Sequence, residues 1–235
     1  MAKKKKKSKN MMERYHGPLI ENEVVLGYIK FVPWLTLVIS GMIFWGMTIG
    51  NSSDVYRTLF EVCIYYSAFA IVISFFDKFI LKFKIFVYLL ISLIFVVLTI
   101  DISCINLLLI SQGGLSSEMM VVCVYIAIGL FLIFSFVYAW YYLPKNQGKI
   151  WAINQWETYE KLLKNKKLMK FLKPLPVVAF VLIVIAVLSG HENYIECVFG
   201  VLNGILDLFA FPALVVDAIY GATYISGNPS YDELE

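Results

Sequence analysis

The chain has 235 residues, of which 60% are apolar and only 16% are charged. Its formal net charge is +3, from 20 basic and 17 acidic residues, and its mean hydropathy is strongly positive. These values exclude an ordinary soluble protein and indicate one integral membrane bundle rather than two soluble domains.

Four apolar runs precede residue 144, and each is long enough for a crossing of about 20 residues. They cover Phe31 to Ile49, Val55 to Phe76, Ile85 to Ile110 and Met119 to Leu143. Pro33 falls in the first turn of the first run, where the missing amide hydrogen costs little. The third run is overlong, so we expect that helix to tilt or to project beyond the bilayer.

A polar, lysine-rich loop follows the fourth run. In it Trp156, Tyr159 and Leu163 are spaced to share one helical face, opposite a lysine-rich face. This pattern predicts an amphipathic helix lying on the inner leaflet. A coupling helix that grips a soluble partner is the alternative, and a pull-down with the loop deleted would separate the two.

Two further runs, Leu175 to Ser189 and Tyr194 to Ile219, complete the chain. The fold class we predict is therefore all-α, a polytopic transmembrane bundle of six spans, or five if the last two runs form a re-entrant pair. The segments are a basic N-terminal segment (1–30), helices one to four (31–143), the amphipathic loop (144–174), helices five and six (175–225) and an acidic tail (226–235).

The distribution of basic residues predicts the orientation independently of hydropathy. Nineteen of the 20 basic residues fall before the first run or in the segments after the second and fourth runs, and only Arg57 falls on the other side. Lysine and arginine in short loops mark the cytoplasmic side. We therefore expect both termini in the cytoplasm, with the protein in a cell membrane, and a bacterial plasma membrane is favoured by the lysine-rich, AT-type residue usage.

The N-terminal "KKKKKSK" is a block of like charge next to the membrane. Each such residue contributes about 1 kcal/mol of attraction to an anionic inner leaflet, so lipid is the expected partner. No recognition helix or interleaved aromatic residues accompany the block, and nucleic acid is not expected as a partner.

Polar and charged side chains within the spans are the default functional candidates, because such groups are costly in lipid. They are Arg57, Glu61, Asp101, Glu196, Asn203 and Asp207. Arg57 and Glu61 are four residues apart on one face, and Asp101 is expected at a similar depth. An ion pair that locks the bundle is the main interpretation, and a substrate or ion site is the alternative.

In the last span Gly200 and Gly204 line up on one stripe with the polar residues Glu196, Asn203 and Asp207. Small residues at this spacing allow a second helix to approach closely. We therefore expect Asp207 to face another helix rather than lipid. A second pair, Gly46 and Gly50 in the first span, is the suggested mate.

Pro212 is expected to kink or break this span near Leu208, which leaves a proton or cation site beside Asp207 as an alternative to a plain kink. Asp217, further along, is expected to reach interfacial water.

The sequence contains no recognisable catalytic, cofactor or metal motif. The four cysteines form no CxxC pair, and they are interpreted as apolar filler, with disulfides as the alternative. We expect a non-enzymatic protein that acts through contacts with another membrane or cytoplasmic protein, as an accessory subunit or an immunity-like factor. A small transporter or permease subunit with a polar path through the membrane is the alternative.

Overall fold

The computed structural model describes Arg14 and residues 23–50, 54–114, 116–143, 145–146 and 192–228. All regular structure in this part of the chain is helical. The predicted loop helix with Trp156, Tyr159 and Leu163, the predicted span at 175–189 and residues 229–235 of the tail lie outside the described residues.

Five helices are long and apolar enough to cross a membrane. They are α1 (Val32–Ile49), α2 (Asp54–Ser74), α4 (Lys84–Ser111), α5 (Ser117–Tyr141) and α9 (Glu192–Gly227), and two short helices, η1 (Leu26–Lys30) and α3 (Asp77–Lys82), accompany them. The predicted helices over the first four apolar runs and over the last run are confirmed. The last helix continues eight residues beyond the predicted end at Ile219.

Local sequence features explain where several helices begin and end. Pro33 lies in the first turn of α1, where no amide hydrogen is needed. The side chain of Ser116 caps α5 by accepting a hydrogen bond from the Met119 amide at 3.3 Å. Gly114 has φ +79°, a left-handed conformation that favours glycine, and it makes the tight turn between α4 and α5 possible.

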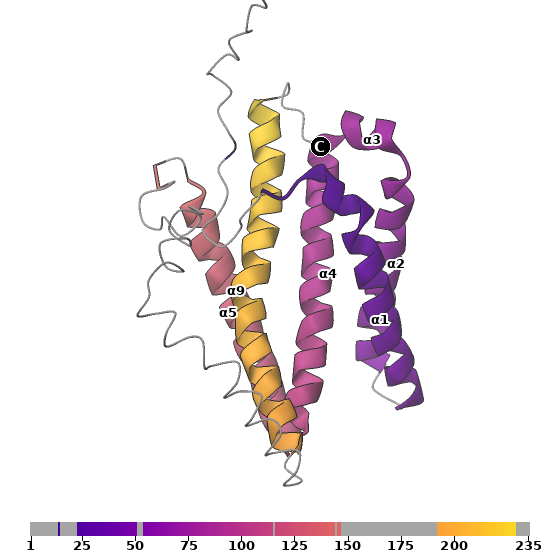
Figure 1. Ribbon diagram of the computed structural model, residues 1–235, viewed down its shortest axis with the longest axis vertical. Coiled ribbons are helices and arrows are strands. Elements are labelled where there is room, and N and C mark those ends of the chain that lie inside the picture. The colour runs from indigo at the N-terminus through magenta and orange to yellow at the C-terminus, as the bar shows by residue number, and fades with distance from the viewer. Residues whose placement is uncertain are drawn as a thin grey trace, which may run out of the picture.

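Helix α4 is the centre of the bundle, and α9 packs along it in the antiparallel direction (Figure 1). The hairpin of α1 and α2 lies on the other side of α4, and α5 packs on α9. Helices η1 and α3 lie at the end of the bundle where α9 ends, which we call the α3 end, while α4 ends and α9 begins at the opposite far end.

The core lies between these helices and is made of aliphatic and aromatic side chains. Ile91, Ile94 and Phe95 of α4 are almost fully buried, and Ala218 and Ala222 of α9 pack into the same cluster. The ring of Phe95 also contacts Tyr28 of η1, with the ring centroids 5.8 Å apart. Helix α4 thus buries side chains toward both of its neighbours, as a central helix must.

Of the kink or break expected near Leu208, the break is wrong, because α9 continues through Pro212 as one helix. Proline disturbs the carbonyls of the preceding turn, which then need other donors. The carbonyl that Pro212 leaves without a donor is that of Leu208, four residues earlier. The carbonyl of the next residue, Phe209, accepts a hydrogen bond from the Tyr138 hydroxyl on α5 at 3.1 Å. The neighbouring helix thus supports the disturbed turn.

Candidate functional site

Asp207 lies between α4 and α9 in a cluster of three polar side chains. The amides of Asn106 and Asn203 donate hydrogen bonds to its Oδ2 at 2.6 and 3.1 Å, and Asn203 also donates to Asn106 Oδ1 at 2.8 Å. Asp207 and Asn203 are half-buried, while Asn106 is buried. We call these three residues the Asp207 cluster. It joins the last span to α4 rather than to α1.

The glycines of α9 pack against α4 at the same place. A Cβ atom added to Gly200 would lie 2.8 Å from the Asn106 carbonyl oxygen, whereas one added to Gly204 would meet nothing closer than 3.8 Å. The suggested mate of this pair is wrong, because Gly46 and Gly50 on α1 are exposed, and a Cβ at Gly46 would meet no atom within 4 Å.

Asp101 on α4 is fully buried and bonds to α1. The hydroxyl of Ser40 is 2.7 and 2.9 Å from its two carboxylate oxygens. One helical turn away, the hydroxyls of Thr36 and Ser67 are 2.9 Å apart and join α1 to α2. A polar seam therefore runs through the contact of α1 with both α2 and α4.

The expected pairing of Arg57 with Glu61 and Asp101 is not present. Arg57 Nη1 lies 3.8 Å from the carboxylate of Asp54 one turn before it, and Glu61 is exposed and accepts a hydrogen bond from Tyr65 at 3.1 Å. Asp101 accepts its hydrogen bond from Ser40 on α1 and not from a residue of α2. Glu196, also expected within the stripe of α9, is exposed.

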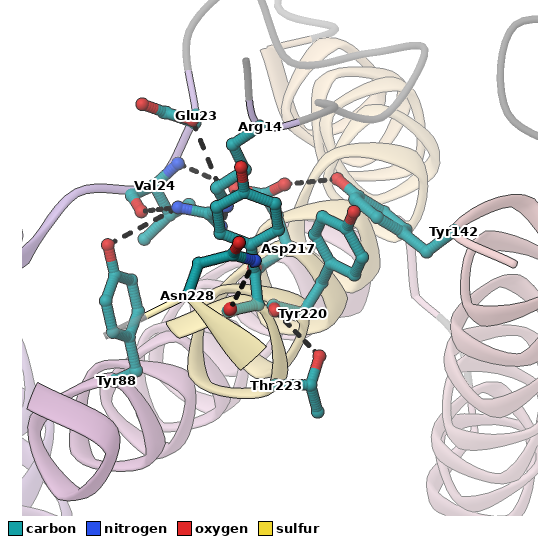
Figure 2. A network of polar contacts seen from close by, with 10 residues as sticks. Arg14, Glu23, Val24, Tyr88, Tyr142, Asp217, Tyr220, Thr223 and Asn228 are labelled. Carbon is teal, nitrogen blue, oxygen red and sulfur yellow. Dashed lines mark hydrogen bonds and ion pairs between the residues drawn. The ribbon is translucent and has the colours of Figure 1, made fainter. Parts of the chain in front are cut away.

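The most extensive polar network of the described chain surrounds Asp217 near the α3 end (Figure 2). Arg14 forms a salt bridge with its Oδ2 at 3.1 Å and also donates to its backbone carbonyl at 2.7 Å. The Val24 amide donates to Oδ2 at 2.6 Å, and the hydroxyl of Tyr142 donates to Oδ1. The side chains of Arg14 and Asp217 are both 0% exposed.

Arg14 is held on its other side as well. It donates to the Val24 carbonyl at 2.7 Å and to the Tyr88 hydroxyl at 3.3 Å. Arg14, Val24 and Asp217 are therefore each hydrogen-bonded to the other two. Its guanidinium also lies over the rings of Tyr88 and Tyr220, 5.3 and 5.9 Å from their centroids. A Cβ on Gly221 would lie 2.8 Å from Arg14 Nη2, so this position leaves no room for a side chain.

We call this the Arg14–Asp217 latch, because it fastens the segment before α1 to helices α4, α5 and α9. The prediction that Asp217 reaches interfacial water is wrong, since its side chain is fully buried and its carboxylate accepts hydrogen bonds from Arg14, the Val24 amide and the Tyr142 hydroxyl. Sequence reasoning counted Arg14 only as one more basic residue of the N-terminal segment. The available signal was that Arg14 is an arginine among lysines, and arginine is preferred in buried ion pairs.

Asn106 was also missed, although an amide inside the long apolar run of α4 is a visible signal.

All four cysteines lie in described helices and are free thiols, so the alternative of disulfides is wrong for this structure. Among the described residues, no three His, Cys, Asp or Glu side chains gather as metal ligands.

Comparison of the chain with family models, curated proteins and solved structures gave no match.

Proposed function

We propose that this chain is a multi-pass membrane protein that acts non-enzymatically through contacts with other proteins, as an accessory subunit or an immunity-like factor. The observation that supports it is the use of the buried acids. Asp101, Asp207 and Asp217 each accept hydrogen bonds from another helix or segment of the chain. Acids bonded in this way stabilise helix contacts, which leaves the outward surfaces for recognition.

The topology we propose has six spans, with both termini on the cytoplasmic side of a bacterial plasma membrane. Parallel packing of α5 and α9 supports an additional crossing between them, because Phe134 lies against Phe209 and Tyr142 bonds Asp217 further along both helices. Parallel neighbours in one chain need a connection that returns across the bundle. Lys30 and Lys84 at the α3 end support a cytoplasmic location for that end.

Helix α5 is the first surface at which to search for a partner. Along its most apolar 18 residues no side chain is buried among the described residues. Tyr125, Leu132 and Phe136 are the most exposed of its large apolar side chains, at 70, 61 and 74%. Aromatic side chains of this kind are enriched in protein interfaces.

The test places a photo-crosslinking amino acid at each position of α5 from 125 to 136 in intact cells. We expect adducts with one other protein that recur every three or four positions, because only one face of a helix can touch a partner. Mass spectrometry would identify the adduct. Adducts with lipid alone at every exposed position of the five helices would contradict the proposal.

The alternative, a small transporter or permease subunit, is favoured by one observation: Asp207 and Asn203 of the cluster are only half-buried, so polar groups reach the edge of the contact between α4 and α9. Asp207→Asn retains the side-chain shape but removes the charge. Under the main proposal we expect stability to fall by about 1 to 3 kcal/mol, and the amount of folded protein to fall with it, because a neutral amide oxygen accepts more weakly than a carboxylate from Asn106 and Asn203.

Size-exclusion chromatography in detergent measures the folded amount. If that amount is unchanged while uptake of protons or cations into cells is lost, the alternative gains and the main proposal fails.

A further inference from the structure

Glu61 is an acid of a described span for which the structure shows no bond to another helix. Glu61 lies on the face of α2 that points away from the bundle, which we call the outer face of α2. The exposed members of this face are Thr58, Glu61, Tyr65, Phe69 and Val72, and the buried members of the opposite face are Phe60, Cys63, Ser67, Ala70 and Ser74. The outer face is therefore apolar and aromatic apart from one carboxylate and two hydroxyls.

The depth of Glu61 follows from the polar boundary at the α3 end. There Lys30 and Asp77 form a salt bridge at 2.7 Å with both side chains exposed. Counted from Phe76, about 20 helical residues cover a hydrocarbon core of roughly 30 Å and reach Arg57. Glu61 is one turn further in, about 6 Å inside the core.

The described part of the chain supplies little to this carboxylate. Its hydrogen bond comes from Tyr65, one turn along the same helix and itself 66% exposed. The nearby cation, Arg57, is directed to Asp54 instead, at 3.8 Å. An acid exposed at this depth is expensive in lipid and needs a complementary charge.

We propose that the outer face of α2 binds a transmembrane helix of a partner protein, and that a lysine or arginine of that helix pairs with Glu61. This rests on the proposed function, and it names the surface and the chemistry of the partner. Between Glu61 and the α3 end, the exposed apolar residues Phe69 and Val72 pack against the partner helix. The ion pair sets the depth and register of the partner helix.

The test uses the full-length protein in cells with a photo-crosslinking residue in place of Phe69. We expect an adduct with a membrane protein, with the crosslinked peptide in a transmembrane helix that has a lysine or arginine one to three turns away. Glu61→Leu should lower the adduct yield at least about tenfold, since one partner of a desolvated ion pair is lost. Glu118→Leu, which removes an exposed acid from the first turn of α5, is the matched control and should leave the yield unchanged.

Charge reversal provides the second measurement. Glu61→Lys should abolish the adduct, and replacing the partner's cationic residue with glutamate should restore it. The amount of protein extracted in detergent should be equal in all variants, because among the described residues Glu61 bonds only within its own helix. Adducts with lipid only, adducts with a second copy of this chain, or a yield that does not depend on Glu61 would overturn the proposal.

The two proposals can fail separately. Adducts along α5 with none at Phe69 would overturn the role of α2 and leave the proposed function in place. Adducts with lipid alone at every exposed position of the five helices would overturn both.

Discussion

Arg14→Leu is expected to lower the free energy of unfolding by about 3 to 5 kcal/mol, because it leaves the Asp217 carboxylate buried without its cation. The same change removes the bonds from Arg14 to the Val24 carbonyl and to the Tyr88 hydroxyl. Titration with SDS in mixed micelles, followed by far-UV circular dichroism, measures the loss.

The matched control is the salt bridge between Lys30 and Asp77, at the same end of the bundle. Its side chains are 48 and 65% exposed, so Lys30→Leu should cost no more than about 1 kcal/mol. The double variant Arg14→Leu with Asp217→Leu should cost less than the sum of the two single changes, since it no longer leaves a buried carboxylate at position 217 without its cation. Equal losses for Arg14→Leu and Lys30→Leu would show that Arg14 is not buried.

Gly200→Ala and Gly204→Ala are expected to have opposite effects on stability. The new Cβ at Gly200 would lie 2.8 Å from a backbone carbonyl and 2.9 Å from Leu109 Cβ, so α4 and α9 must move apart. Such overpacking costs about 1 to 3 kcal/mol. At Gly204 the contacts are of ordinary length, at 3.8 Å or more, and alanine is the better helix former by about 1 kcal/mol.

The same titration distinguishes these two variants. Gly46→Ala serves as a second control, because a Cβ there meets no described atom within 4 Å. A Gly200→Ala protein as stable as the Gly46→Ala protein would mean that α9 does not approach α4 at Gly200 as closely as the structure indicates.

The five described helices that can cross a membrane were predictable because each is a property of one stretch of chain. An apolar run of sufficient length satisfies its own backbone hydrogen bonds, whatever lies beside it. The inward face was predicted correctly for Asp207, which bonds to Asn106 of α4, but not for Glu61 and Glu196, which are exposed. A regular spacing, however, gives only the face and not the identity of the helix that meets it.

The partners of the polar residues depended on that missing information. Arg57 and Glu61 are at the correct spacing for an ion pair, but Arg57 is directed to Asp54 and Glu61 to Tyr65. Asp207 accepts a hydrogen bond from Asn106 on α4 rather than from a group on α1, because α9 packs along α4.

What the sequence determined by itself is which stretches of this chain form the five described helices that are long and apolar enough to cross a membrane. The tertiary structure alone decided that Arg14 and Asp217, 203 residues apart, form a buried pair. The physical reason is that hydropathy and periodicity describe each helix by itself. A hydrogen bond or an ion pair, by contrast, depends on atoms within a few ångströms, which only the packing of the helices brings together.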